Sequence, residues 1–203
     1  MVSRRTFWGR VSALLAATLL SSTVLAQSLS DRLNELGPEG TSLANQVGVW
    51  DVTETVWATP DAKPVVKKGI AVRRMIGSLL QETLHPGNDL SDATISRIDY
   101  LSFNRVEGRW DYVSMDMRDP LGIMPAASFE RDPSNRIEVV FAPFSVPGNG
   151  AAVSGQMLRM NTIIETSQDG NNVKNQYFIL ADGTGRKWLA HRYAYTRRPE
   201  PGA

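Results

Sequence analysis

The sequence predicts an all-β protein, an antiparallel up-and-down barrel of about 8–10 strands with a short helix in front of it. From residue 47 onward, short segments of alternating apolar and polar residues follow one another. Turn-forming Gly, Pro, Asn and Asp residues separate these segments, and no long helical pattern lies between them. Consecutive hairpins place each strand beside the previous one, and closure into a barrel leaves no edge strand exposed.

The first 26 residues have the organisation of an export signal that precedes this fold. Arg4, Arg5 and Arg10 form a basic start, an apolar run covers residues 11–25, and small residues stand at the end of Val24-Leu25-Ala26. We therefore predict a signal peptide over residues 1–26. The mature chain is then expected to begin near Gln27, to form a single domain over residues 27–203 and to be periplasmic or secreted.

Two export routes fit this signal. The paired arginines of Ser3-Arg4-Arg5-Thr6-Phe7 are typical of the twin-arginine route, which carries folded proteins. Trp8 and Gly9 depart from the usual continuation of that pattern, so the general secretory route stays open. The apolar run is shorter than the roughly 20 residues that a membrane-spanning helix needs, and we expect no membrane span.

A helix is predicted at the start of the mature chain, over Ser28–Leu36, with Ser30 as its N-cap and Gly37-Pro38 as its end. Thr41–Gln46 is expected to add a further turn of helix. The predicted strands are Val49–Trp57, Val65–Ile76, Ser78–Leu84, Arg97–Asn104, Arg109–Met117, Ser128–Arg131, Ile137–Ala142, Met157–Thr166, Val173–Leu180 and Lys187–Thr196.

The connections between these strands contain the residues that turns require. Gly77, Val106-Glu107-Gly108, Asp132–Asn135 and Asp169–Asn172 each separate two alternating segments. The segment Phe144–Gly155 is long and rich in Gly and Pro, and we interpret it as a lid or a plain loop.

Composition excludes several classes of protein. The first 26 residues hold three of the 22 basic residues and none of the 21 acidic ones, so the remaining chain carries a net charge of −2. Such a chain has no basic excess for binding nucleic acid. The sequence contains no cysteine, which excludes disulfides and a lipid-anchoring cysteine. The hydrophobic core must therefore supply the stability of the domain.

Gly48-Val49-Trp50 follows the predicted helix and begins the first strand. This motif resembles the Gly-x-Trp of lipocalin-like barrels, which implies that Trp50 closes one end of the barrel. In those barrels an arginine of the last strand packs over the tryptophan, and Arg192 or Arg197 matches that part here.

The wider pattern resembles the bacterial DUF1579 family over about Leu33–Arg198. The resemblance rests on the order of four segments: Val47–Val52, the hairpin Asp99–Met117, Asp119–Met124 and Tyr193–Arg198. It implies a lipocalin-like barrel and carries neither an assigned function nor catalytic residues.

Metal and cofactor sites find little support in the sequence. The chain has two histidines, His85 and His191, and no cysteine, and it lacks the spacing of a zinc site. A haem with one axial histidine is the alternative left open, with His191 as the better placed residue. The sequence also lacks the Gly-x-Ser-x-Gly and Ser-x-x-Lys motifs of nucleophilic enzymes. We expect no metal and no cofactor.

The last predicted strand offers candidate ligand-binding residues on both of its faces. His191, Tyr193 and Tyr195 share one face, which would place two phenols and an imidazole in the barrel. Arg192 belongs to the other face, which would place a cation for an anionic group there. A third possibility is that the aromatic residues lie outside and Arg192 covers Trp50.

Acidic residues on the inward phase of two strands form a second candidate group. Glu54 is in phase with Trp50 and Val52, and Glu82 shares a face with two leucines. A buried carboxylate needs a partner, and Arg74 is the expected one. This group could act as a general acid and base, or it could be a structural ion pair.

Three hypotheses about function follow. The first is a periplasmic barrel that binds a small apolar or amphipathic molecule. The second is an isomerase, lyase or hydrolase that uses polar residues of the barrel cavity, and we regard an enzyme as the weaker alternative. The third is an envelope module that binds another protein through its loops.

Overall fold

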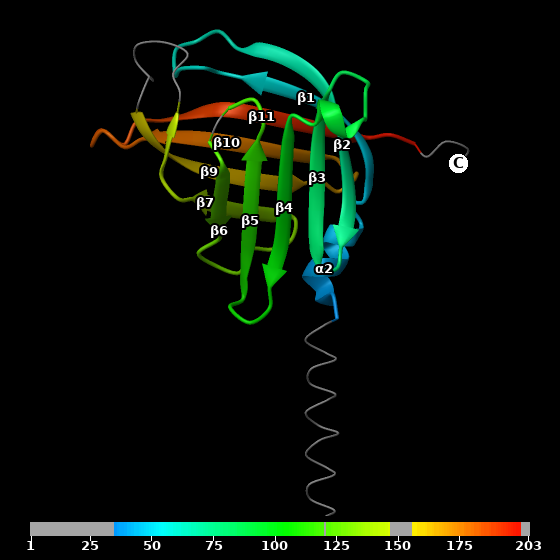
Figure 1. Cartoon of the computed structure of the whole chain (residues 1–203). Coiled ribbons are helices and arrows are strands. Elements are labelled where there is room, and N and C mark those ends of the chain that lie inside the picture. Colours follow the sequence, from blue (N-terminus) through cyan, green and yellow to red (C-terminus); the bar gives the residue numbers. More distant parts are fainter. Residues whose placement is uncertain (1–34, 120, 147–155, 200–203) are drawn as a thin grey trace, which may run out of the picture. The chain divides into compact units, whose positions relative to one another are not determined.

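A computed structural model of the chain describes residues 35–119, 121–146 and 156–199. The described part consists of antiparallel strands, a short helix and one 3-10 turn (Figure 1). These elements are α2 (Gly37–Ala44), β1 (Gly48–Val56), β2 (Val65–Ile76), β3 (Leu79–Pro86), η1 (Asp92–Thr94), β4 (Arg97–Asn104), β5 (Arg109–Asp116), β6 (Ile123–Ala127), β7 (Arg136–Phe141), β8 (Phe144–Val146), β9 (Gln156–Thr166), β10 (Asn172–Leu180) and β11 (Lys187–Arg197). None of the described helices is long and apolar enough to cross a membrane.

Ten of the strands close into a barrel. Strands β1 to β7 pair in sequence order, β7 pairs with β9, β9 with β10, β10 with β11, and β11 with β1. The strands of the near wall and those of the far wall cross at a steep angle in Figure 1. This confirms the predicted fold class, an all-β antiparallel barrel consistent with the lipocalin-like fold.

Most of the strand predictions agree with the structure to within two residues at each end. Strands β2 and β4 have the predicted bounds. The β2–β3 hairpin has the two-residue connection Gly77-Ser78, and Gly77 adopts a φ of 59°. A positive φ at the first central residue suits a tight turn between twisted strands, and glycine adopts it without strain.

The predicted helix boundary is wrong. Gly37-Pro38 begins helix α2 and does not end a helix before it, since Glu35 and Leu36 are not helical. Proline suits the first turn of a helix because the amide groups there have no partner inside the helix. The rest of the predicted helix Ser28–Leu36 lies outside the described residues, as do residues 1–26.

Two further corrections concern residues 123–146. The predicted strand Ser128–Arg131 is absent, and strand β6 lies earlier in the chain, at Ile123–Ala127, where Pro125 weakens the strand pattern. The segment Phe144–Gly155 was interpreted as a lid or a plain loop, but its first residues, Phe144–Val146, form strand β8 against β9. Residues 147–155 lie outside the described part of the chain. Pro143 has no N–H group, and strands β7 and β8 pair with β9 on either side of it.

Strand β11 contains a β-bulge at Ala190. Gln176 of β10 pairs with His191, whereas the next residue of β10, Tyr177, pairs with Leu189. Ala190 is therefore the extra residue, and the alternation of inward and outward side chains changes there. As a result the buried positions are even-numbered before the bulge, as at Trp188, and odd-numbered after it, as at Tyr193 and Tyr195.

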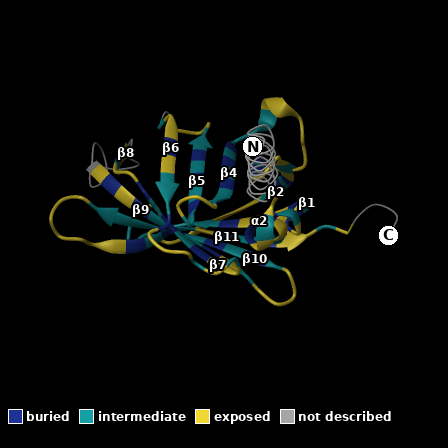
Figure 2. Ribbon diagram, turned by 90° about the horizontal axis from the view of Figure 1, so that it is seen from below, coloured by how far each residue is buried: buried dark blue, intermediate teal, exposed yellow. Residues whose placement is uncertain are grey.

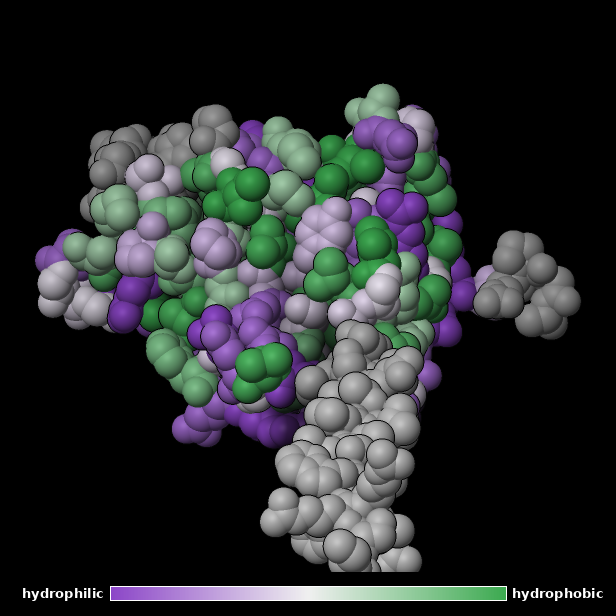
Figure 3. Space-filling model, turned by 60° about the horizontal axis from the view of Figure 1, so that its bottom comes forward, coloured by the Kyte–Doolittle hydropathy of each residue, from purple (hydrophilic) through white to green (hydrophobic). Residues whose placement is uncertain are grey.

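The barrel interior next to helix α2 is filled with side chains. Leu43 of α2 belongs to the same buried cluster as Trp110, Tyr112 and Phe141. In Figure 2 the exposed residues concentrate in the loops, and buried residues recur along the strands. The outer surface in Figure 3 mixes hydrophobic and hydrophilic residues.

Trp50 lies where β1 leaves helix α2, at the end of the barrel that α2 occupies. Its Nε1 donates a hydrogen bond to the carbonyl oxygen of Gln46 at 3.0 Å. The guanidinium carbons of Arg73 and Arg197 lie 5.0 Å and 4.9 Å from its ring centroid, which are cation–π distances. Of the two arginines expected to pack over Trp50, Arg197 therefore does so, whereas Arg192 is exposed.

Replacement of Trp50 by alanine is expected to lower the free energy of unfolding by about 3–5 kcal/mol, as loss of a buried aromatic side chain does. Phe129→Ala is the control, because Phe129 is 89% exposed. Urea unfolding of the two variants checks this expectation. A Trp50→Ala variant as stable as the control would contradict the role of Trp50 in closing the barrel.

Candidate functional site

Five charged side chains from four strands lie together in the middle of the barrel, and we call them the inner charge cluster. Its members are Arg73, Glu82, Arg97, Asp99 and Lys174, all at most 6% exposed. Lys174 bridges the two acids, with Nζ 2.9 Å from Glu82 and 2.7 Å from Asp99. Arg73 contacts Glu82 at 2.7 Å, and Arg97 contacts Asp99 at 3.1 Å.

Hydroxyl groups and aromatic rings complete the surroundings of this cluster. Tyr195 donates to Glu82 at 2.9 Å, and Ser114 donates to Asp99 at 2.6 Å. The guanidinium groups of Arg73 and Arg97 lie over the rings of Tyr195 and Tyr193, each at 4.3 Å. The buried charges therefore have ionic partners, hydrogen bonds or aromatic faces around them.

Both carboxyl groups of the cluster are ionised. Burial alone would raise the pKa of Glu82, but the positive charges of Lys174, Arg73 and Arg97 hold that pKa well below its usual range. Burial also opposes ionisation of Asp99, and the charges of Arg97 and Lys174 lower its pKa in the same way. With three cations and two carboxylates, the cluster carries one net positive charge.

A second polar network surrounds Glu54, and we call it the Glu54 network. Tyr193 donates to Glu54 Oε1 at 2.7 Å, and His191 Nδ1 lies 3.1 Å from the same oxygen. Arg118 contacts Glu54 Oε2 at 3.1 Å and Asp116 at 2.6 Å. Burial raises the pKa of Glu54, but the hydrogen bond from His191, the charge of Arg118 and the Tyr193 hydroxyl outweigh it and hold that pKa well below its usual range.

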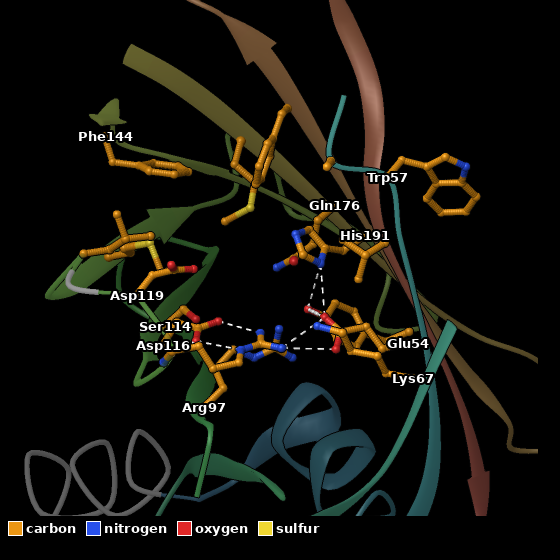
Figure 4. A pocket seen from close by; sticks show the side chains of 18 residues that line it. Glu54, Trp57, Lys67, Arg97, Ser114, Asp116, Asp119, Phe144, Gln176 and His191 are labelled. Atoms are coloured by element: carbon orange, nitrogen blue, oxygen red, sulfur yellow. Dashed lines mark hydrogen bonds and ion pairs between the residues drawn. The ribbon is translucent and has the colours of Figure 1, made fainter. Parts of the chain in front are cut away.

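A cavity of about 290 Å³ adjoins both groups of residues. Its polar lining includes members of both groups and two exposed residues of opposite charge: Arg97, Ser114, Gln176, His191, Tyr193, Glu54, Asp116 and Arg118, with the exposed Lys67 and Asp119. Its apolar walls include Val56, Leu121, Met124, Phe144, Met160 and Phe178. Figure 4 shows Glu54 and His191 on one side of this cavity and Asp116 and Asp119 on the other.

The structure brings together several of the residues predicted from the sequence. Glu54, His191 and Tyr193 line the cavity, while Glu82 and Tyr195 belong to or contact the inner charge cluster. The structure thus selects the inward aromatic face of the last strand from the alternatives. That these residues bind a ligand stays a prediction.

Two predicted site residues lie elsewhere. Arg192 is on the outer face of β11, and Arg74 is on the outer face of β2, where it donates to Gln81 at 2.6 Å. The expected partner of Glu82 is wrong by one residue, because Arg73 points inward and Arg74 does not. In β2 Ala71 and Arg73 are buried and share the inward phase, whereas Arg74 is in phase with Val72 and Ile76.

Sequence reasoning missed four members of the inner charge cluster. The available signal was alternation: Arg97 and Asp99 are in phase with Leu101, and Lys174 is in phase with Gln176. His85 follows the predicted strand Ser78–Leu84, but it lies within β3, 2% exposed, between the hydroxyls of Thr83 and Thr94 at 3.1 Å each. Among the residues described, no group of three or more metal-ligating side chains is arranged to hold a metal ion.

Removal of one partner from the inner charge cluster should be costly. Lys174→Met leaves Glu82 and Asp99 close together with fewer cations, and we expect a loss of about 3–5 kcal/mol in the free energy of unfolding. The control is Arg186→Met, which breaks an exposed ion pair with Asp61 and should cost less than about 1 kcal/mol. Denaturant titration compares the two, and equal losses would contradict the assignment.

The Glu54 network should make stability depend on pH. Since the pKa of Glu54 is lower in the folded chain than its ordinary 4.5, the unfolded chain takes up a proton first as the pH falls. The stability that Glu54 contributes is complete above that ordinary value and is lost as the pH falls toward the folded pKa. We expect Glu54→Gln to lose less stability than the wild type between about pH 5 and pH 3.

Unfolding measured at several pH values checks this expectation. Tyr193→Phe is the matched control, since it removes one hydrogen bond and keeps the carboxylate, so most of the wild-type slope should remain. A Glu54→Gln slope as steep as that of the wild type would show that other groups cause the acid sensitivity.

Comparison with known proteins adds no relative to this description. No family model matches the chain, and a search of the curated proteins finds no match. The architecture is that of a closed antiparallel barrel compatible with the lipocalin-like fold, and membership of the DUF1579 family finds no support beyond the resemblance itself.

Proposed function

We propose that this protein is an exported barrel that works in the periplasm and binds one small apolar or amphipathic molecule inside the barrel. The observation that carries the proposal is the cavity of about 290 Å³, with apolar walls on one side and Arg97, Gln176, His191 and Tyr193 on the other. Small-molecule sites have this composition, and their volumes begin at roughly 300 Å³. The ligand is therefore expected to be small.

The rigidity of the polar side supports binding. Tyr193 is held between its hydrogen bond to Glu54 and the guanidinium of Arg97, and His191 is stacked on Tyr193 with ring planes 4° apart. A site whose side chains are already ordered loses little entropy when a ligand enters. The flexible Met124 and Met160 of the apolar wall can adapt to the shape of the ligand.

The proposed location rests on the sequence. Residues 1–26 have the basic start, apolar centre and small-residue end of an export signal. The sequence contains no cysteine, so the packed core, and not disulfides, would stabilise the domain outside the cytoplasm.

The Glu54–His191 pair favours an enzyme as the second candidate. A carboxylate that orients an imidazole beside a cavity is an arrangement suited to general acid–base chemistry, as in an isomerase, lyase or hydrolase. In this alternative His191 takes a proton from the substrate, and the molecule retained in the cavity is a substrate or product that the protein interconverts.

Native mass spectrometry of the protein purified from the periplasm tests the proposal. We expect a chain mass without residues 1–26 and an additional mass of one small molecule per chain. Val56→Trp should remove the bound mass, because the larger side chain fills the cavity. Val66→Trp is the matched control, since Val66 is 60% exposed.

Three outcomes separate the possibilities. A retained molecule that Val56→Trp excludes supports binding in the barrel. A retained molecule that converts to a second species when returned to the protein favours the enzyme. Protein without any retained molecule, and with no affinity for small apolar compounds, would contradict the proposed function.

A further inference from the structure

The hydrogen bonds around Glu54 determine which nitrogen of His191 carries the proton. An ionised carboxylate can only accept hydrogen bonds, and Glu54 is paired with Arg118 at 3.1 Å. Its Oε1 lies 3.1 Å from His191 Nδ1, so Nδ1 is the donor. The Tyr193 hydroxyl donates to the same oxygen at 2.7 Å. In the neutral ring Nε2 then carries the lone pair.

The unprotonated Nε2 belongs to the ring of His191, which lines the cavity. Nδ1 makes the polar contacts of the ring, and Nε2 has no hydrogen-bond partner among the side chains that the structure describes. The ring cannot easily turn, because it stacks on Tyr193 at 5.9 Å and contacts Phe178 at 5.7 Å between centroids. Figure 4 shows this ring beside Gln176, with its Nδ1 directed to Glu54.

Four of the six charged side chains that line the cavity are ion-paired, and the other two, Lys67 and Asp119, are exposed and opposite in sign. Arg118 is held by Asp116 and Glu54, and Arg97 by Asp99 and Glu82. The inner charge cluster carries one net positive charge, and Arg118 with Asp116 and Glu54 carries one net negative charge. A ligand carboxylate placed at His191 Nε2 would face the lone pair of that nitrogen and would lie near the negative charge of Glu54. A neutral group that donates a hydrogen bond meets neither penalty.

We propose that His191 Nε2 accepts a hydrogen bond from a hydroxyl group of the ligand, so that the cavity selects a neutral alcohol or phenol over a carboxylate or an ether of similar size. The inference rests on the proposed function, since it names the chemical class of the molecule bound in the barrel. At the roughly 30 Å³ that a water molecule occupies in the liquid, the cavity has the room of about ten waters, and a fused two-ring aromatic fits a space of this size.

Binding of four probes to the purified chain at pH 7.5 tests this inference: 2-naphthol, 2-methoxynaphthalene, naphthalene and 2-naphthoate. We expect 2-naphthol to bind roughly 3- to 10-fold more tightly than 2-methoxynaphthalene, which lacks the O–H donor, and than 2-naphthoate. His191→Phe keeps a ring between Phe178 and Tyr193 and removes the acceptor, so 2-naphthol should lose its advantage over 2-methoxynaphthalene. Arg192→Gln, on the outer face of the same strand, should retain the preference.

A second measurement does not depend on a variant that folds. Nitrogen NMR of the histidine rings reports the tautomer directly, and the sequence has only one other histidine, His85. We expect a protonated Nδ1 and a bare Nε2 in His191, with the Nε2 signal shifting when 2-naphthol binds.

The results distinguish failure of this inference from failure of the proposed function. Equal affinity for the four probes, tighter binding of 2-naphthoate, or a proton on Nε2 would overturn the hydroxyl inference and leave binding in the barrel intact. No binding of any of the probes, together with no retained molecule in the protein from the periplasm, would overturn both.

Discussion

The buried ion pairs in the middle of the barrel are the constraint on which the rest of the structure depends. Strands β2, β3, β4 and β10 each contribute a charge, and none of these charges can be buried without its partners. A shift of one residue in any of these strands would turn its charged side chain outward and leave a partner uncompensated. The cluster therefore penalises every register but the observed one.

The cavity follows from the same arrangement. Apolar side chains from α2 and the strands fill the barrel on one side of the ion pairs, around Leu43 and Trp110. Towards the cavity the polar layer continues through Arg97, Tyr193 and Glu54, where side chains are tied to one another and cannot collapse into the empty space. The space that remains is bounded by a rigid polar side and by apolar walls.

Local patterns in the sequence were sufficient for most of the fold. Alternation and turn residues placed the hairpins, because hairpin pairing depends on neighbouring residues. The local patterns failed at two prolines. Gly37-Pro38 was predicted to end a helix but begins one, and Pro125, a residue that usually interrupts strands, lies inside strand β6. Strand β8 is only three residues long and could not be distinguished from a loop.

The candidate site was less predictable, because its geometry depends on residues far apart in the chain. The choice between Arg73 and Arg74 is decided by Glu82 across the β2–β3 hairpin, and the apolar residues of β2 suggest the opposite phase. Lys174 reaches Asp99 over 75 positions of sequence, a contact that no local pattern indicates. Glu54 and the aromatic face of β11 could be predicted from the sequence, because their side chains alternate regularly with those of their neighbours.

The extra residue in β11 divides that strand into two parts with separate roles. Residues 187–189 help to build the wall near Phe178, and residues 191–195 provide the imidazole and phenols of the interior. Because Ala190 absorbs the change in alternation, a substitution among residues 187–189 can alter the packing against Phe178 without changing which face of the strand carries the imidazole and phenols. The contacts of Phe178 can thus be varied separately from the polar contacts that residues 191–195 make in the interior.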